Sequence, residues 1–405
     1  MSWWWLSCLY FIEGLAAFGI GLEIALITMH FVSLIYSKMY MNKKPPELMK
    51  AEVEGVSILK PLKGVDPHLE DNLETFFEID YPQYEILFCI QDEDDPAHEV
   101  VRRAMSKHPN IDAKIVTGGS NGKRQGVNPK INNLLPAYDI MKYNLFWICD
   151  SGIRVLPLTL RDLVSKMTDK VALVHAVPYT SNRKGFSSMV EKIYFGTQHT
   201  RVYIAAHVIG VVCMTGMSTL IRRDYFDKCT GGLGKLSQYI AEDYFMAKYI
   251  SENGYKLALA SYPACQNPGN YGIRSFVDRM TRWTILRIFM VPLAVILEPF
   301  SECFLCGLVF SWSCLHYFSW NMLVVFLYHV LVWFLFDHLL FRQLENGHLQ
   351  MSKCDFLIAW FIRETLTPYI VLRALMNPTI KWRDGRYRLK CGGTVEEVEQ
   401  DSHIV

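Results

Sequence analysis

Residues 145–154, with the sequence LFWICDSGIR, constrain the fold of this chain more than any other stretch. Five apolar residues, the length of a buried strand, end abruptly at Asp150 and are followed by Ser151 and Gly152. Open α/β sheets deliver charged groups to their carboxyl edge in this way, where such groups face a ligand. An aspartate at a strand end can equally form a turn or cap a helix, so both interpretations of Asp150 stay open at this point.

Strand-like and helix-like segments alternate around this strand. Asp66-Pro67 and Asp95-Pro96 each resemble a helix N-cap followed by proline at the first helical position. The pattern predicts an α/β, Rossmann-like domain with a mainly parallel sheet. The expected strands are residues 56–60, 85–90, 114–116, 145–149 and 171–177.

A long apolar segment precedes the predicted domain. Residues 6–36 are too long for the core of a cleaved signal peptide and lack a basic start and a clear cleavage site. We therefore expect a retained transmembrane helix at residues 1–37 and a linker at 38–54. No Lys or Arg precedes this helix, whereas Lys38, Lys43, Lys44 and Lys50 follow it. The positive-inside rule therefore predicts that the next domain, residues 55–288, faces the cytosol.

Three polar residues interrupt this helix. Glu13 and His30 are expected near the membrane interfaces, whereas Glu23 is expected to face protein, water or a polar ligand, because polar groups at membrane depth are costly.

The chain is mostly apolar again at residues 289–376, where we expect C-terminal membrane helices before a cytosolic tail at 377–405. Prolines and glutamates in residues 289–310 favour an interfacial or re-entrant segment. Residues 314–336 are the best spanning candidate. Residues 356–375 could span a membrane only if Arg363 and Glu364 pair or face protein.

Composition agrees with a soluble domain joined to membrane segments. Of 405 residues, 51% are hydrophobic and 13% aromatic. The 41 basic and 40 acidic residues form no basic stripe, which excludes nucleic acid as an expected partner. Most of the eleven cysteines stand singly, as Cys89, Cys149, Cys213 and Cys265 do, so we expect them to be reduced and the main domain to lie in a reducing compartment.

The second predicted strand ends in an acidic turn that contains Asp92 and Asp95. Four carboxylates there need a cation, hydrogen-bond donors or water to offset their repulsion. A solvated turn with Asp95 as a helix cap is the alternative. Because Asp150 ends another strand of the same sheet, the two acidic strand ends suit a nucleotide held partly through a divalent metal.

A glycine-rich loop at residues 118–133 leads from the third strand into a helix. Glycine permits close approach to phosphate, and a helix N-terminus favours anions, although no Walker or Gly-x-Gly-x-x-Gly pattern occurs. Lys130 and Asn132 could contact a pyrophosphate or simply begin the helix, and Lys130 is the better candidate.

Later positions offer further candidates. His199 is a structural histidine or a functional one. Asp243 lies near a helix start, as an ordinary cap or as a general base. Arg279, Arg282 and Trp283 fall within about one helical turn, where they could clamp an anion and wall a pocket, or form a membrane-facing belt.

Together these motifs resemble those of the ceramide glucosyltransferases, in order and over nearly the whole chain. The matching segments are residues 60–66 (KPLKGVD), the acidic turn through Asp95, 128–133 (NPKINN), 148–154 (ICDSGIR), 241–245 (AEDYF), 279–283 (RMTRW) and 386–394 (RYRLKCGGT). The resemblance implies a multi-pass, inverting glycosyltransferase of the A-type fold in the Golgi membrane. Its catalytic domain would face the cytosol and transfer glucose from UDP-glucose to the primary hydroxyl of ceramide.

The resemblance also implies roles for the three acidic motifs. Asp95, with Asp92 within reach, would help to bind the uridine nucleotide. Asp150 would coordinate a divalent metal, Mg²⁺ or Mn²⁺, on the diphosphate. Asp243 would be the base that takes the proton from ceramide. The Asp-x-Asp motif of the wider superfamily is Asp150-Ser151-Gly152 here, so only one of its two carboxylates is present.

The remaining site residues follow from the same resemblance. Arg279, Arg282 and Trp283 would hold the leaving diphosphate and shape the acceptor site. His199 and Cys213 fall on positions associated with activity or inhibitor sensitivity in this family.

Two other functions compete with this one. A processive polysaccharide synthase shares the acidic motifs and the Arg-Trp element but normally needs more spanning helices. A nonenzymatic lipid-binding or scaffolding membrane protein would not need Asp243 and would not bind UDP-sugars. Self-association into a homo-oligomer is left open.

Overall fold

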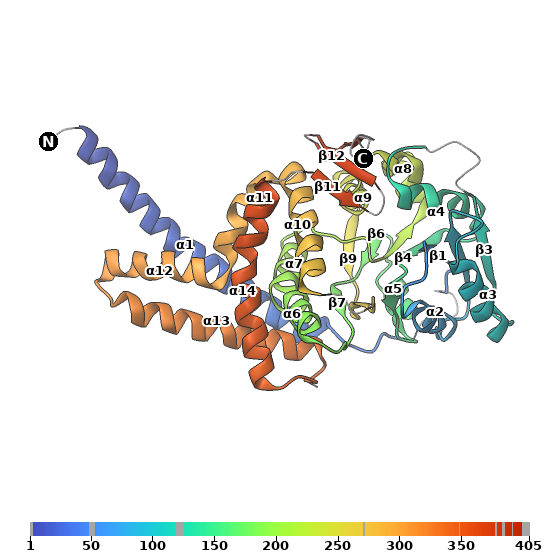
Figure 1. Cartoon of the computed structure of the whole chain (residues 1–405), viewed down its shortest axis with the longest axis horizontal. Coiled ribbons are helices and arrows are strands. Elements are labelled where there is room, and N and C mark those ends of the chain that lie inside the picture. Colours follow the sequence, from blue (N-terminus) through green and yellow to red (C-terminus); the bar gives the residue numbers. More distant parts are fainter. Residues whose placement is uncertain are drawn as a thin grey trace, which may run out of the picture. The chain divides into compact units, whose positions relative to one another are not determined.

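Figure 1 shows the computed structural model, which describes residues 3–47, 53–118, 125–269, 272–347, 349–376, 379–382, 385–390 and 392–398. Lys50 and residues 119–124 of the glycine-rich loop lie outside these ranges. The chain divides into two compact units. The α/β unit comprises residues 40–185, 206–271 and 379–405, and the helical unit comprises residues 1–39, 186–205 and 272–378.

A seven-stranded sheet forms the centre of the α/β unit, in the order β3-β2-β1-β4-β8-β6-β9. Neighbouring strands are parallel except at β8, which runs antiparallel to both β4 and β6. The predicted fold class, α/β with a mainly parallel sheet, is confirmed. The strands are β1 (Val56–Leu62), β2 (Tyr84–Ile90), β3 (Ala113–Thr117), β4 (Leu145–Cys149), β6 (Val171–His175), β8 (Ser218–Arg222) and β9 (Lys256–Leu259).

Amphipathic helices flank this sheet. In α2 the buried residues Leu69, Leu73, Phe76 and Phe77 recur at helical spacing, which forms one apolar face. This helix begins two residues later than Asp66-Pro67 suggested, since Asp66 contributes its carbonyl, which accepts the Leu69 N–H at 2.9 Å. The helices are α2 (Leu69–Phe77), α3 (Ala97–Lys107), α4 (Pro129–Ile140), α5 (Thr159–Ser165), α8 (Arg223–Thr230), η3 (Leu233–Gln238) and α9 (Glu242–Glu252).

Two small sheets complete the α/β unit. One has the order β5-β10-β7, with β5 (Ile153–Arg154), β7 (Pro178–Thr180) and β10 (Ala264–Gln266). The other joins β11 (Thr379–Trp382), β12 (Gly385–Leu389) and β13 (Val395–Val398) in chain order. An isolated bridge joins Thr394, in the turn before β13, to Tyr239, just before α9. The chain therefore returns to the α/β unit after its last long helix.

The helical unit contains the long apolar helices (Figure 1). By length and composition α1 and α13 can each cross a membrane. The segment 295–301 and α12 pass the same test only together, and a bend of 78° separates them, so they form either a broken span or a re-entrant loop. The helices are α1 (Trp3–Tyr40), α6 (Phe186–Tyr194), η2 (Phe195–His199), α7 (Thr200–Val208, which continues into the α/β unit), α10 (Ile273–Met290), α11 (Pro292–Leu297), η4 (Glu298–Ser301), α12 (Cys303–Phe318), α13 (Met322–Leu344) and α14 (Lys353–Met376).

The spanning segment expected at residues 314–336 was placed wrongly, because it runs across the turn between α12 and α13. Ser319 has φ of +56°, which ends α12. The Asn321 side chain then accepts the N–H groups of Leu323 and Val324 at 3.0 and 3.2 Å and caps α13. An apolar composition that continues through such a turn hides the turn from hydropathy.

The charges inside α14 are paired, which was the condition for residues 356–375 to span a membrane. Arg363 and Glu364 are each 1% exposed, and Arg363 forms ion pairs with Glu364 and Glu302. His30, expected near a membrane interface, is completely buried beside Arg201 and Asp337, because those charged partners stabilise a polar ring in the helical core.

Candidate active site

The amide of Asn128 joins two helix starts in the α/β unit. Its Oδ1 accepts the backbone N–H groups of Lys130 at 2.8 Å and Ile131 at 3.2 Å, which caps α4. Its Nδ2 donates to the Tyr239 carbonyl at 2.7 Å and to Glu242 Oε2 at 2.9 Å. The N-termini of α4 and α9 are therefore held side by side.

Lys130, at the start of α4, is the cation at the centre of this cluster. Its Nζ lies 2.8 Å from Asp150 Oδ1, 3.2 Å from Glu242 Oε1 and 3.0 Å from the Gly216 carbonyl. Although burial lowers its pKa, the charges of Asp150 and Glu242 raise the pKa of Lys130 above its ordinary value. Lys130 therefore stays charged and links Asp150, just after β4, to Glu242, the first residue of α9.

Asp243 lies in the first turn of α9, and two backbone N–H groups hold its carboxylate. Oδ2 accepts from Gly216 at 2.6 Å, and Oδ1 accepts from Tyr244 at 2.8 Å. Burial and the neighbouring Glu242 charge raise the pKa of Asp243 to about 7, against the opposing effects of Lys130 and the two N–H groups. The group is thus poised to exchange a proton near neutral pH.

Gly216 leaves room for these two side chains to meet. A Cβ atom at this position would lie 3.1 Å from Asp243 Cβ and 3.2 Å from Lys130 Nζ, closer than ordinary packing. Gly216 lies two residues before β8, which pairs with β4, and the Asp150 N–H donates to the Met217 carbonyl at 3.0 Å. A small pocket opens here, lined by Lys130, Ile148, Met214, Gly216, Glu242 and Asp243 among others.

The acidic turn lies at the same edge of the sheet, because β1 lies between β2 and β4. Both Asp95 oxygens accept the Gly64 N–H at 2.9–3.0 Å, and Oδ1 also accepts the Ala97 N–H at 2.8 Å. Asp95 therefore ties the end of β1 to the start of α3, which begins at Ala97 with Pro96 as its N-cap, one residue later than Asp95-Pro96 suggested. The Asp92 side chain is exposed, and its carbonyl accepts from His98 Nε2 at 3.1 Å.

Lys60 was missed as a separate candidate, although it lies in one of the matching motifs. It is fully buried in β1, where its Nζ donates to the Asp150 carbonyl at 2.7 Å and lies 3.8 Å from the Phe76 ring centre. Burial lowers the pKa of Lys60 to about 8. A lysine within an apolar strand was the available signal, since such a lysine needs a buried partner. Glu242, which binds both Asn128 and Lys130, was also missed as a site residue.

A second cluster, in the helical unit, brings together His199 and the residues of the Arg-Trp motif. The His199 ring lies 5.6 Å from the Tyr203 ring and 6.0 Å from the Trp283 ring. Burial lowers the pKa of His199 to about 3, so the ring is neutral, and its Nδ1 has no hydrogen-bond partner among the described residues. Arg279 lies 5.8 Å from the Trp283 ring centre and pairs with the buried Glu191.

Arg282 and Cys213 complete the predicted set. Burial, with the charge of Arg279, lowers the pKa of Arg282 to about 10, which leaves it charged at neutral pH. Cys213 is a partly exposed cysteine in the α/β unit, three residues before Gly216 on the segment that enters β8. Within the described part of the chain, no group of three or more His, Cys, Asp or Glu side chains is arranged to hold a metal ion.

Comparison with known proteins identifies the family. Residues 25–395 match the sequence model for glycosyl transferase family 21. The chain belongs to this family. Ceramide glucosyltransferase 3 of Caenorhabditis elegans is 39% identical over 94% of this chain and 82% of its own length. Ceramide glucosyltransferase of Komagataella phaffii is 30% identical over 90% of this chain and 87% of its own length. The resemblance stated from the sequence is thereby confirmed, and the protein is a hexosyltransferase.

Among solved structures, the chain is similar to the mannosyltransferase PcManGT from Pyrobaculum calidifontis in complex with GDP-Man and Mn²⁺. The TM-score is 0.47 at 15% identity, over 90% of this chain and 98% of that one.

Proposed function

We propose that this protein transfers glucose from UDP-glucose to the primary hydroxyl of ceramide with inversion, giving β-glucosylceramide and UDP, with Asp243 as the base. One observation carries the mechanism: a partly buried carboxylate, that of Asp243, has a pKa near 7 and is held by two N–H groups beside Lys130. The names of the family 21 relatives support the substrates.

The chemistry needs one base and no covalent intermediate. The ceramide oxygen attacks the anomeric carbon, the bond from that carbon to the UDP oxygen breaks on the opposite face, and the hydroxyl proton passes to an Asp243 oxygen. A hydroxyl is a weak nucleophile near neutral pH, so a positioned base contributes about 10²–10⁴ in rate. A carboxylate with a pKa near 7 is deprotonated enough to accept a proton and basic enough to hold it.

The donor would bind at the carboxyl edge of the sheet. The exposed Asp92 and the turn fixed by Asp95 support a site for the uridine nucleotide, and Lys130 supports a nearby site for its diphosphate. Asp150 is 40% exposed, and Mg²⁺ or Mn²⁺ commonly binds one or two carboxylates together with substrate phosphates, so Asp150 fits a metal that arrives with UDP-glucose. Such a metal would neutralise charge on the leaving diphosphate.

We assign the acceptor and leaving-group roles to the second cluster and to Cys213. The charged Arg279 and Arg282 suit a diphosphate, and the rings of His199 and Trp283 suit the apolar body of a lipid. The His199 Nδ1, which has no partner among the described residues, suits a hydroxyl or amide of the acceptor.

Location is part of the proposal. The apolar helices fit a membrane protein, and we propose the Golgi membrane, with the α/β unit in the cytosol as the lysines after α1 favour. The domain boundaries expected from the sequence are likewise proposals. Self-association is a further proposal that cross-linking in membranes can test.

Activity of the purified full-length protein tests the proposal. In detergent with UDP-glucose and a short-chain ceramide, we expect glucosylceramide and UDP in equal amounts. Asp243→Asn should lower kcat by about 10²–10⁴ and keep UDP binding, because the amide fills the same space but cannot take the proton. Glu252→Gln, at the exposed far end of α9, is the matched control and should keep full activity.

Each negative result has its own meaning. Absence of ceramide transfer by the wild type would overturn the proposed function. Wild-type activity in Asp243→Asn would overturn only the assignment of the base.

A further inference from the structure

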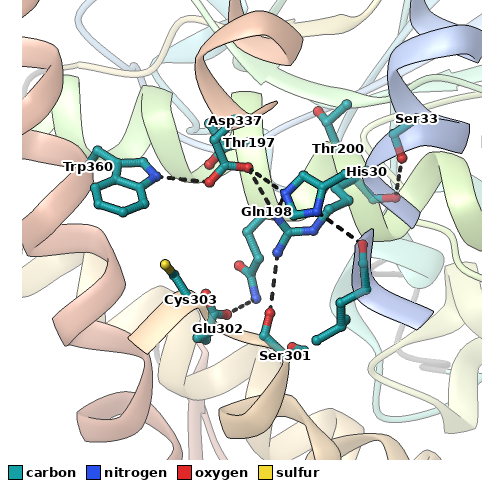
Figure 2. A network of polar contacts seen from close by, with 12 residues as sticks. His30, Ser33, Thr197, Gln198, Thr200, Ser301, Glu302, Cys303, Asp337 and Trp360 are labelled. Atoms are coloured by element: carbon teal, nitrogen blue, oxygen red, sulfur yellow. Dashed lines mark hydrogen bonds and ion pairs between the residues drawn. The ribbon is translucent and has the colours of Figure 1, made fainter. Parts of the chain in front are cut away.

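A polar network in the helical unit includes His30, Asp337 and Trp360 (Figure 2). Arg201 and Asp337 are both completely buried, and Arg201 Nη1 lies 2.9 Å from Asp337 Oδ1. The same Nη1 lies 2.8 Å from His30 Nε2, and Nη2 donates to the Ser301 carbonyl at 3.3 Å. One guanidinium therefore joins α1, η4 and α13 to α7.

The donors and acceptors of this network agree with one another. His30 Nδ1 lies 3.0 Å from the Leu26 carbonyl and so must carry the proton, which leaves Nε2 free to accept from Arg201. Asp337 Oδ2 accepts the Trp360 Nε1–H at 2.9 Å. Asp337 is thus fixed from α14 by Trp360 as well as from α7 by Arg201.

A second set of contacts fixes η2, immediately before α7. The Gln198 amide donates to Glu302, and Glu302 also pairs with Arg363 on α14. Arg363 Nη2 lies 3.4 Å from Thr197 Oγ1. Three side chains of the η2–α7 segment, Thr197, Gln198 and Arg201, are therefore held by the long helices.

His199 lies on another side of the same segment. It is two residues from Arg201, about 200° around the helix at 100° per residue. Its ring contacts the rings of Tyr203 and Trp283. The polar contacts of Thr197, Gln198 and Arg201 fix the rotation of this segment about its helix axis. That rotation in turn determines where the His199 ring lies.

The segment η2 is a π-helix, and two threonine hydroxyls bind its backbone. The Thr200 hydroxyl donates to the Phe195 carbonyl at 2.6 Å, five residues back, and the Thr197 hydroxyl donates to the Ile193 carbonyl at 2.7 Å. Single π turns are uncommon and occur frequently at functional sites. A shift in rotation here would move His199 away from Trp283.

Stability alone is a weak explanation for the network. Desolvation of buried charges is costly, and well-packed apolar side chains of similar volume often stabilise a protein as well or better. Buried charges form directional contacts, and these fix one arrangement of the helices among several.

We propose that Arg201 and Asp337 are positioning residues for the acceptor: they set the rotation of η2 and so hold His199 against Trp283. This inference rests on the proposed function, since it takes the aromatic cluster as the site of the ceramide acceptor. Both residues are completely buried, and the proposal places neither of them in contact with the substrate.

Two variants of the full-length protein in detergent test the proposal. Asp337→Asn leaves the Arg201 charge without its carboxylate, and the double variant Arg201→Met with Asp337→Leu removes the pair without leaving a charge unpaired. We expect both to raise KM for short-chain ceramide by about tenfold through misplacement of the acceptor, with KM for UDP-glucose unchanged. Hydrogen–deuterium exchange of residues 195–199 should become faster in both.

The matched control is Glu23→Gln. Glu23 Oε1 lies 3.0 Å from His329 Nδ1, so this pair also joins α1 to α13, and among the described residues the polar contacts of Glu23 are with His329 and Cys306, not with η2 or α7. We expect an unchanged KM for ceramide and unchanged exchange at residues 195–199.

A double variant with wild-type KM for ceramide and wild-type exchange would overturn the positioning role. The exchange measurement needs no substrate, so slow exchange in the variants counts against the inference even if the wild type proves inactive on ceramide. An inactive wild type whose variants exchange faster would instead overturn the proposed function alone.

Discussion

The immediate surroundings of Asp243 determine its pKa. Burial and the Glu242 charge raise its pKa to about 7, and a base must be deprotonated to act. We therefore expect kcat/KM to rise about tenfold per pH unit below pH 7 and to level off above it. A pH profile between 5.5 and 8.5 measures this. A profile that is flat across pH 7 would count against Asp243 as the base.

The same carboxylate should lower the stability of the protein at alkaline pH. Its pKa is near 4 in the unfolded chain and about 7 in the folded protein, so the folded state binds the proton more tightly. The free energy of unfolding thus falls as pH rises from 4 to 7 and is constant above. Asp243→Asn should raise Tm by a few degrees at pH 8, and the difference should shrink at pH 5. Equal Tm values for the wild type and Asp243→Asn at pH 8 would show that the ionised Asp243 does not lower the stability.

Gly216 is the residue whose side chain would most directly disturb the cluster. In Gly216→Ala the new Cβ would lie 3.1–3.2 Å from Asp243 and Lys130, so one of them must move. Because a shift of about 1 Å can cost about 10²-fold in rate, we expect kcat to fall by about that factor with UDP binding kept. Steady-state kinetics and UDP titration measure the two quantities. Wild-type kcat would show that Asp243 tolerates displacement.

Between elements, α1 lies close to α12 at Gly19. A Cβ there would lie 2.3 Å from Ser313 Oγ and 3.1 Å from the Val309 carbonyl, whereas a Cβ at Gly21 would meet nothing within 4 Å. Small residues let helices in membranes pack this closely. Gly19→Ala should therefore destabilise the protein by about 1–3 kcal/mol through overpacking.

Gly21→Ala is the matched control, since it makes the same chemical change two residues away in open space. Thermal unfolding in detergent compares the two variants. Equal Tm values would mean that α1 does not depend on this contact.

The path of the whole chain restricts how it crosses a membrane. The chain leaves the α/β unit at residue 272 and returns to it at residue 379, so the segment between must cross an even number of times. Only three residues separate α12 from α13, and α13 is a clear spanning candidate. We therefore infer that α12 and α13 both cross and that α14 does not, with α1 as a further span.

Epitope tags can test this path. With the α/β unit in the cytosol, a tag inserted after Ser319 should face the lumen, and a C-terminal tag should face the cytosol. Antibody should reach the C-terminal tag when only the plasma membrane is permeabilised, and the inserted tag only after all membranes are. Access to both tags under the first condition would contradict two crossings.

The sequence by itself determined five of the seven strands of the main sheet, the acidic residues at the ends of two of them and the apolar, span-length character of α1, but it did not predict β8 or β9. It could do so because strand burial, turn chemistry and hydropathy are local properties of neighbouring residues. The turn between α12 and α13 was lost for the converse reason, since its apolar flanks conceal a cap made by a single asparagine.

Only the tertiary structure decided which groups meet. Lys130 and Asp243 are 113 positions apart, and the pKa of Asp243 depends on burial and on charges that other segments supply. Arg201 and Asp337 are separated by 136 positions, and nothing near either one in the chain predicts the other. Electrostatic energy depends on distance and on exclusion of water, and folding alone sets both.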